Sequence, residues 1–262
     1  MKRILPLLAL SLLLSACSVF QRKVEEEKIA TAEQMYKEAK EELDGANYNR
    51  AVKAFEALQA RYPYGIYAQQ AELEIAYANY KDNEPTLALA AIDRFLKQHP
   101  THANVDYALY LKGRVNFIED RSLFASLARQ DMAERDPKAA KESFEAFRNL
   151  VNRFPDSRYA EDARSRMAYL VTALADHDLY VARYYYKRGA YLATANRAKD
   201  IIENYSQTDR LESALVMMVA AYDKLGQNEL RDDARRVLMQ NYPQSKLTAA
   251  DVIGNDAWWK LW

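Results

Sequence analysis

Residues 48–63 read Tyr-Asn-Arg-Ala-Val-Lys-Ala-Phe-Glu-Ala-Leu-Gln-Ala-Arg-Tyr-Pro, and this segment predicts an amphipathic helix that ends at a proline. Ala51, Phe55 and Leu58 are spaced i, i+4 and i+7, so they lie on one helical face. Pro63 cannot continue the helix, and its ring disfavours the α conformation of the residue before it. We interpret the segment as the second helix of a helical hairpin. Such a hairpin is too small to bury both of its faces, so it needs further hairpins to pack against.

The ending of this helix recurs along the chain as an aromatic residue or histidine followed by proline. The pairs are Tyr62-Pro63, His99-Pro100, Phe154-Pro155 and Tyr242-Pro243, with a degenerate copy at Tyr205-Ser206. The second members of these pairs, used as markers, are separated by 37, 55, 51 and 37 residues. Two steps are close to the 34-residue period of tetratricopeptide repeats, and the other two are longer by about half a unit. The spacing predicts about five tetratricopeptide-like hairpins.

The position twelve residues before each marker supports this repeat assignment. In four units it holds a small residue, as is typical of the second helix of such a hairpin; these are Ala51, Ala88, Ser143 and Thr194. In the fifth unit the same position holds Arg231. We therefore expect the second helix of the fifth unit to be shifted.

The composition favours an all-α protein. Among 262 residues there are only 6 Gly and 7 Pro, 50% of the residues are apolar, and no segment shows the two-residue alternation of a strand. Lys and Arg total 37, and Asp and Glu also total 37, so the charge balance does not indicate nucleic-acid binding. We expect an α-solenoid of about five hairpins and no nucleic-acid partner.

Residues 1–16 are expected to form a secretory signal peptide. Two basic residues precede an apolar run over residues 4–14, which is too short to span a bilayer, and small residues precede the cleavage point. The only cysteine follows at once, and Leu14-Ser-Ala-Cys17 matches the lipid-attachment signal of bacterial lipoproteins. We expect Cys17 to carry S-diacylglycerol and an N-palmitoyl chain, which together anchor a protein stably, and residues 17–28 to form a tether. The alternative is an incidental cysteine after an ordinary signal peptide.

The loop after the first hairpin carries three tyrosines, Tyr62, Tyr64 and Tyr67. They either pack between adjacent repeats or line a concave surface that binds an extended peptide. Amphipathic aromatic side chains are suited to both roles and are common interaction hot spots. The sequence leaves the two alternatives open.

The sequence contains no arrangement typical of an active site. The cysteine is assigned to lipid, and His99, His102 and His177 have no nucleophile arranged around them. Pro100 disfavours a regular helical pair of the first two histidines, and no third ligand cluster accompanies them. Zinc-protease, phosphate-loop and dinucleotide-binding motifs are also absent from the sequence. We expect no catalytic residue, no metal and no cofactor.

The two long steps between markers have different predicted causes. In the third unit, residues 119–135 are an insertion with apolar residues, which packs on its own repeat or contacts a partner. The next helix is expected to have Asp136 as its N-cap and Pro137 as its first residue. In the fourth unit, residues 158–188 contain neither Gly nor Pro. They predict one long helix that joins the first three repeats to the last two and is weakest at residues 176–178.

These boundaries divide the mature chain after the tether into three parts. Residues 29–156 are predicted to form repeats 1–3, residues 157–250 repeats 4–5, and residues 251–262 a C-terminal tail. The tail contains all the tryptophans of the chain, Trp258, Trp259 and Trp262. It covers apolar surface of the fifth hairpin, docks on a partner, or enters the lipid interface, where Trp is favoured.

Six short motifs occur in a fixed order over essentially the whole mature chain. They are the lipid-attachment signal, Arg61-Tyr-Pro63, Pro100-Thr-His-Ala-Asn-Val-Asp-Tyr107, Arg135-Asp-Pro137, Tyr185-Tyr-Lys-Arg-Gly-Ala-Tyr191 and Asn196-Arg197. Each is weak alone, but in this order they resemble the BamD family of outer-membrane lipoproteins, some of which are called ComL-type competence lipoproteins. The departures are Ala103, where many relatives have Pro, Ser206 at the fourth repeat end, and the tryptophan-rich tail.

The resemblance implies a non-enzymatic scaffold of the outer-membrane β-barrel assembly (BAM) complex. Ser18, rather than Asp, after the lipidated cysteine implies sorting to the outer membrane, facing the periplasm. The C-terminal repeats are expected to dock on a periplasmic POTRA domain of a BamA-type insertase and on other BAM lipoproteins, and the N-terminal repeats to contact unfolded outer-membrane protein substrates. Arg188, Tyr191 and Arg197 are the implied partner-binding residues, although Arg197 could instead form a salt bridge with Asp200. The alternative function is a tetratricopeptide lipoprotein that binds peptidoglycan or belongs to a secretion or competence system.

Overall fold

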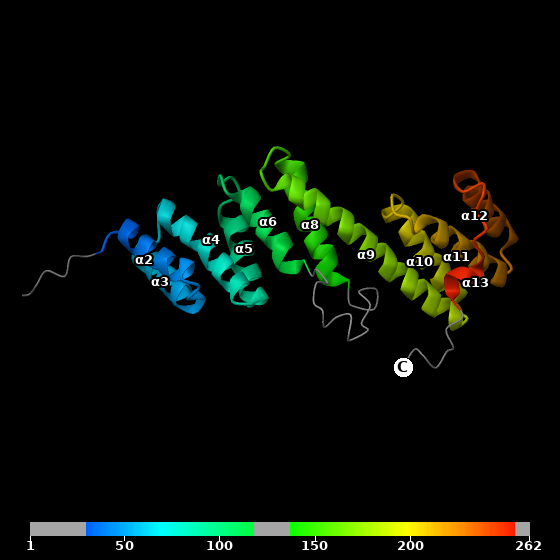
Figure 1. Cartoon of the computed structure of the whole chain (residues 1–262), viewed down its shortest axis with the longest axis horizontal. Coiled ribbons are helices and arrows are strands. Elements are labelled where there is room, and N and C mark those ends of the chain that lie inside the picture. Colours follow the sequence, from blue (N-terminus) through cyan, green and yellow to red (C-terminus); the bar gives the residue numbers. More distant parts are fainter. Residues whose placement is uncertain (1–29, 118–136, 255–262) are drawn as a thin grey trace, which may run out of the picture. The chain divides into compact units, whose positions relative to one another are not determined.

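The computed structural model describes residues 30–117 and 137–254, and within these ranges every regular element is an α-helix (Figure 1). The helices are α2 (Ala32–Asp44), α3 (Tyr48–Arg61), α4 (Ile66–Lys81), α5 (Pro85–Gln98), α6 (Val105–Asn116), α8 (Lys138–Arg153), α9 (Ala160–Lys187), α10 (Tyr191–Asn204), α11 (Leu211–Lys224), α12 (Asn228–Asn241) and α13 (Ala249–Ile253). The predicted all-α class is confirmed. The signal peptide, the tether, the insertion at 119–135 and the tryptophans of the tail lie outside the described residues.

The chain forms two compact units, residues 1–71 and residues 72–262, and each is described by itself. In the first unit α2 packs against α3. The predicted amphipathic helix is confirmed as α3, and the residues expected on its inner face, Ala51, Phe55 and Leu58, are fully buried. The local spacing of apolar residues therefore correctly predicts the buried face of this hairpin's second helix.

In the second unit consecutive helices pack on one another in chain order (Figure 1). Helix α5 packs on α6, α6 on α8, α8 on α9, α9 on α10, α10 on α11 and α11 on α12. The short helix α13 returns to pack on α11 and α9. This succession of hairpins agrees with the predicted tetratricopeptide-like solenoid.

The five predicted repeat ends have one structure in common. After each second helix, the aromatic residue or histidine donates its backbone N–H to the carbonyl oxygen four residues earlier, at 2.8–2.9 Å. The donors and acceptors are Tyr62 and Leu58, His99 and Phe95, Phe154 and Leu150, Tyr205 and Ile201, and Tyr242 and Leu238. A proline in the next position has no N–H with which to continue the helix. The fourth end has Ser206 instead and forms the same hydrogen bond, so the degenerate copy is a repeat end as predicted.

The expected shift of the fifth unit is wrong. Helix α12 begins fifteen residues before its marker Pro243, as α3, α5 and α10 do before theirs. Arg231 therefore occupies the position that is fully buried in the other four units, yet its side chain is 22% exposed. The Arg231 Nη1 lies 3.2 Å from Oδ1 of Asp223 and 2.9 Å from Oδ1 of Asn228. The long stem of arginine lets its charged head stay at the surface, so the helix keeps its register.

The predicted long helix is confirmed as α9, which contains 28 residues without interruption. It extends from Ala160 to Lys187, inside the predicted range of 158–188. It packs on α8 of the third hairpin and on α10, and also contacts α11 and α13. Residues 176–178, expected to be its weakest point, are part of the regular helix.

Helices α6 and α8 are in tight contact at Gly113. A Cβ atom at this position would lie 2.4 Å from a ring carbon of Phe147, which is fully buried. Ser143 on α8 donates its hydroxyl to the carbonyl oxygen of Gly113 at 2.9 Å. The position of the Phe147 ring therefore requires glycine at position 113.

Helix α8 begins one residue later than predicted, with Pro137 as its N-cap residue instead of its first residue.

Candidate partner-binding surfaces

Arg197 lies on α10 and pairs with a carboxylate that the sequence analysis did not single out. Its Nη1 is 3.1 Å from Oδ1 of Asp178 on α9 and 3.7 Å from Oδ2 of Asp200. The Arg197 side chain is 39% exposed, whereas that of Asp178 is only 6% exposed. The alternative pair with Asp200 is therefore present, but the closer contact is with the buried acid. The exposed part of the Arg197 side chain remains accessible to a partner.

The environment of Asp178 makes its charge dependent on Arg197. Burial raises the pKa of Asp178, and the positive charge of Arg197 opposes this increase without cancelling it. Burial also raises the pKa of the nearby Tyr205 hydroxyl, and the charges of Asp178 and Asp200 raise it further. A carboxylate at this depth destabilises the fold unless it is paired. Arg197 thus stabilises the contact between α9 and α10.

The sequence contains a signal that identifies Asp178 as buried. Asp178 lies four residues after Leu174 and four residues before Ala182, and both of these residues are buried. An acidic residue on the apolar face of a long helix must be paired, because an isolated buried charge is very costly. The apolar periodicity of α9 therefore places Asp178 on the buried face, within the segment expected to be the weakest point of the helix.

Asp176 fixes α9 to a second neighbouring element. Its carboxylate accepts a hydrogen bond from Nε of Arg210, which is the N-cap residue of α11. Arg210 also pairs with Asp209, at 2.8 Å from Nη1. The hydrogen bond with Asp176 is the main cause of the raised pKa of the Arg210 guanidinium. Asp176 and Asp178 together connect α9 to both α10 and α11.

Arg188 and Tyr191, the other residues implied by the resemblance, lie around the turn between α9 and α10. Arg188 is exposed, and its guanidinium lies over the ring of Tyr184 at 5.3 Å from the centroid. Tyr191 is half-buried and packs edge to face on Tyr186, with 5.2 Å between the ring centroids. Within residues 137–254, no hydrogen bond or ion pair joins Arg188 or Tyr191 to Arg197. The three residues therefore do not form one bonded cluster.

A mostly apolar cleft of about 390 Å³ opens on the last hairpin. Helices α11 and α12 and the segment leading into α13 supply its lining. The lining residues from these elements are Val216, Val219, Ala220, Asp223, Arg235, Leu238, Met239, Leu247 and Ala249. Tyr186 also lines the cleft, so its ring connects the cleft to the packing around Tyr191. Concave apolar surfaces of this kind accept apolar side chains of a partner.

The three tyrosines of the first loop differ in their environments within the first unit. The Tyr62 hydroxyl donates a hydrogen bond to the carbonyl oxygen of Ala30 at 2.9 Å. The Tyr67 ring packs on that of Tyr36, with 5.5 Å between the centroids. The Tyr64 side chain is 91% exposed. Tyr62 and Tyr67 therefore have roles in packing, and Tyr64 presents its ring to solvent.

Several predicted sites fall outside the described residues or form no cluster within them. The lipidation site Cys17 and the tail residues Trp258, Trp259 and Trp262 lie outside the described residues. Among the described residues, no three His, Cys, Asp or Glu side chains are grouped so that they could hold a metal ion. Over the same ranges, no helix is both long enough and apolar enough to cross a membrane.

Comparison with known proteins places the chain in a family. The family model described as outer membrane lipoprotein, YfiO, matches residues 28–238. The chain belongs to this family. Several proteins named outer membrane protein assembly factor BamD are similar to this chain along its full length. That of Neisseria meningitidis serogroup A is 49% identical over 267 residues and covers 100% of both chains.

More distant relatives of this chain are also named BamD. The BamD of Vibrio cholerae serotype O1 is 36% identical over 79% of this chain and 86% of its own. The BamD of Xylella fastidiosa is 35% identical over 90% of this chain and 80% of its own. Among solved structures, the crystal structure of MamA protein covers 83% of this chain and 96% of its own, at 13% identity and a TM-score of 0.35. That structural likeness is too low to carry an argument.

Proposed function

We propose that the chain is a non-enzymatic outer-membrane lipoprotein that serves as a scaffold of the β-barrel assembly complex. In this role it assists the folding and insertion of β-barrel proteins into the outer membrane. The observation that carries the proposal is the 49% identity, over the full length, to a protein named outer membrane protein assembly factor BamD. The succession of helical hairpins supports a scaffold role, because such repeats provide extended surfaces for several partners.

Cys17 is proposed to carry the lipid anchor that holds the chain on the periplasmic side of the outer membrane. The match of residues 14–17 to the lipid-attachment signal and the family description as outer membrane lipoprotein support this assignment. A Cys17→Ser variant should fail to incorporate labelled palmitate and should no longer fractionate with the outer membrane, whereas Ser18→Ala should behave as the native chain. Palmitate labelling and outer-membrane attachment that survive Cys17→Ser would exclude this anchor.

The C-terminal repeats are proposed to dock on a POTRA domain of a BamA-type insertase and on other BAM lipoproteins. The exposed parts of Arg188 and Arg197 and the cleft beside Tyr191 provide charged and apolar contacts for this purpose. Unfolded outer-membrane protein substrates are proposed to contact the N-terminal repeats, where Tyr64 is exposed. Site-specific photocrosslinking from positions 64 and 188 tests the two assignments separately.

Depletion of the chain in cells distinguishes the proposed function from its alternative. If the chain serves barrel assembly, the levels of several unrelated outer-membrane barrels should fall together, while periplasmic proteins stay constant. Restoring the native chain from a plasmid should restore the barrels. Unchanged barrels, combined with a defect in peptidoglycan attachment, secretion or competence, would instead support the alternative class of lipoprotein.

A further inference from the structure

The loop after the first hairpin has an apolar tip, residues 64–66, that protrudes into solvent. Tyr64 is 91% exposed and Ile66 is 65% exposed, the two highest values among the large apolar side chains that the structure describes. Gly65, between them, has a φ of +104°, and a Cβ atom there would have no neighbour within 4 Å. Contiguous exposed apolar surface marks a site of contact with another molecule or with a membrane.

The other four repeat ends lack this apolar tip. Tyr64 and Ile66 lie one and three residues after the marker Pro63. The equivalent residues of the other ends are small, polar or charged; they are Thr101 and Ala103, Asp156 and Arg158, Gln207 and Asp209, and Gln244 and Lys246. A turn between repeats therefore does not need large apolar residues at these two positions, and the tip of the first loop has a purpose other than repeat packing.

The loop is held in place on both sides of its tip. The side-chain Nε2 of Gln59 on α3 donates a hydrogen bond to the carbonyl oxygen of Ala68 on α4 at 3.0 Å. The Tyr67 ring packs on that of Tyr36 on α2. A loop that is already ordered loses little conformational entropy when its tip meets another surface.

The same loop binds the chain where the segment with the proposed lipid anchor ends. The Tyr62 hydroxyl donates its hydrogen bond to the carbonyl oxygen of Ala30, the first residue that the structure describes. Cys17 is thirteen residues earlier, so even a fully extended chain keeps Ala30 within about 45 Å of the lipid-bearing residue. A contact between tethered surfaces forms at a high effective concentration, so two apolar side chains can maintain it.

The residue types in this segment suit the interface of a bilayer. Tyrosine is favoured there, because its ring is apolar and its hydroxyl can stay among water and headgroups. Between Ala57 and Ala71 the only charged residue of the sequence is Arg61, which is exposed. An arginine at this depth can contact a lipid phosphate while its stem lies along apolar surface. The segment has no acidic residue to repel the phosphate groups.

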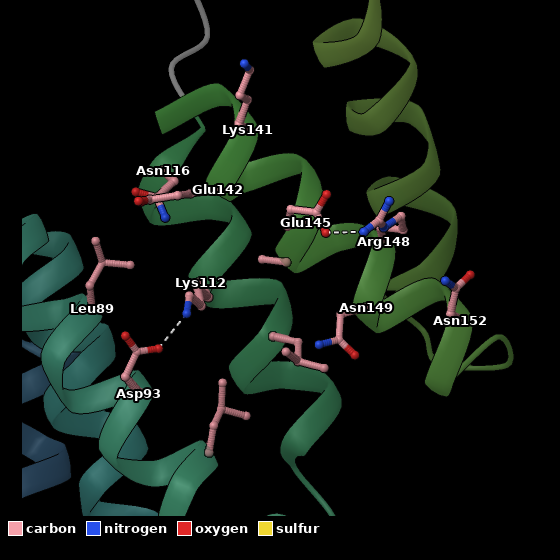
Figure 2. Close-up of a pocket in the computed structure, with 13 residues that line it drawn as sticks. Leu89, Asp93, Lys112, Asn116, Lys141, Glu142, Glu145, Arg148, Asn149 and Asn152 are labelled. Atoms are coloured by element: carbon pink, nitrogen blue, oxygen red, sulfur yellow. Dashed lines mark hydrogen bonds and ion pairs between the residues drawn. The ribbon is translucent and has the colours of Figure 1, made fainter. Parts of the chain in front are cut away.

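A charged hollow is unsuited to the same contact. In the second unit, a groove of about 640 Å³ over α6, between α5 and α8, is lined by three acidic and three basic side chains (Figure 2). Lys112 Nζ in this groove lies 2.6 Å from Oδ1 of Asp93 (Figure 2). Burying such charges in an apolar medium is costly, whereas a protruding apolar loop enters it readily.

We propose that, when no substrate is bound, Tyr64 and Ile66 insert into the periplasmic leaflet of the outer membrane and Arg61 contacts a lipid phosphate. A protein anchored at one residue can turn freely about it, so this second contact fixes the orientation of the first hairpin relative to the bilayer. The proposal rests on the proposed function, because that function supplies the anchor at Cys17.

The test uses the full-length lipidated chain in vesicles of phosphatidylethanolamine and phosphatidylglycerol. Lipidation blocks the sulfur of Cys17, so Tyr64→Cys introduces the only free thiol, which is labelled with an environment-sensitive fluorophore. The label at position 64 should emit at shorter wavelength than in water and should be quenched by lipids with brominated acyl chains. The matched control Thr101→Cys, the exposed equivalent position of the next repeat end, should show neither effect.

A second substitution tests the partner side chain of the tip. Adding Ile66→Ser to the chain labelled at position 64 should lower the equilibrium constant for insertion about tenfold, because it removes apolar surface that enters the bilayer. Adding Leu192→Ser, which changes an exposed leucine on α10, should leave the quenching unchanged. Equal quenching in both variants would contradict the role of Ile66 and overturn the proposal.

Three other results also overturn it. Equal quenching at positions 64 and 101 would indicate unselective adsorption to lipid. A label at position 64 that changes only when an unfolded outer-membrane protein is added would assign the tip to substrate. A native chain that binds vesicles and takes no fluorophore, combined with no quenching at position 64, would leave the anchor intact and refute the insertion alone. Labelling of Cys17 in the native chain would instead refute the anchor, and the insertion with it.

Discussion

Replacing Arg197 with alanine is expected to lower the free energy of unfolding by about 2 kcal/mol at pH 7. The change leaves the Asp178 carboxylate buried and without its partner at 3.1 Å. Removing one member of a buried pair typically costs about 3–5 kcal/mol, whereas exposed pairs contribute about 0–1 kcal/mol. The expected value lies between these limits, because the Arg197 side chain is 39% exposed and water replaces part of its interaction. The matched control Lys199→Ala removes an exposed pair with Glu203 on the same helix, and should cost less than about 0.5 kcal/mol.

The stability that Arg197→Ala removes should become smaller as the pH is lowered. Burial raises the pKa of Asp178 above its ordinary value of 3.8, so the folded state binds the proton more readily than the unfolded state. The contribution of this group to stability is therefore largest below the ordinary value and is lost as the pH rises through the folded-state pKa. Without Arg197 that pKa rises further, so the difference between native chain and variant should shrink as the pH is lowered from 7 toward 4. Urea denaturation followed by far-ultraviolet circular dichroism across this range measures it.

A second substitution separates stability from partner binding. Adding Asp178→Asn to Arg197→Ala removes the unpaired charge and should recover most of the lost stability. A loss that is independent of pH and is not recovered by Asp178→Asn would refute the reasoning. If the exposed part of Arg197 also contacts the insertase, the stable double variant should still recover less insertase on co-purification.

Two further predictions concern packing inside each unit. Gly113→Ala should destabilise the fold by about 1–3 kcal/mol, because the new Cβ would meet the buried Phe147 ring. This cost should exceed the gain from the better helix propensity of alanine. Thermal unfolding measures the effect, and an unchanged midpoint would contradict the prediction. Tyr62→Phe should cost about 0.5–1.5 kcal/mol through loss of the hydrogen bond to Ala30, whereas Tyr64→Phe should stay within about 0.5 kcal/mol in the same urea titration. Equal effects of the two tyrosine substitutions would argue against the assigned packing role of Tyr62.

The fold was predictable where it depends on local chemistry. The aromatic–proline endings mark the ends of α3, α5, α8 and α12, because a missing N–H and the ring of proline act on the preceding residues directly. The absence of Gly and Pro likewise indicated the uninterrupted helix α9. The expected shift at Arg231 is wrong, because one residue does not decide the register of a whole helix. Helix α12 ends in the same backbone hydrogen bond, from Tyr242 to Leu238, as the other repeat ends, so it keeps their register.

The surroundings of the candidate site could not be read from the sequence in the same way. Arg197 was named through the resemblance, but its partner Asp178 lies nineteen residues earlier on another helix. Their contact depends on how α9 and α10 pack, and spacing along one helix does not reveal that. The same holds for Gly113, whose role appears only when α8 brings the Phe147 ring against it. Periodicity could have placed Asp178 on the buried face, but it could not have named Arg197 as its partner.

Purification of the chain from detergent-solubilised outer membranes tests the central claim most directly. We expect one large protein, with a membrane barrel and periplasmic POTRA domains, to co-purify in a fixed ratio, and the Arg197→Ala, Asp178→Asn double variant to lower that ratio while remaining folded. Recovery of the chain alone, or with peptidoglycan fragments in place of a barrel protein, would contradict the account.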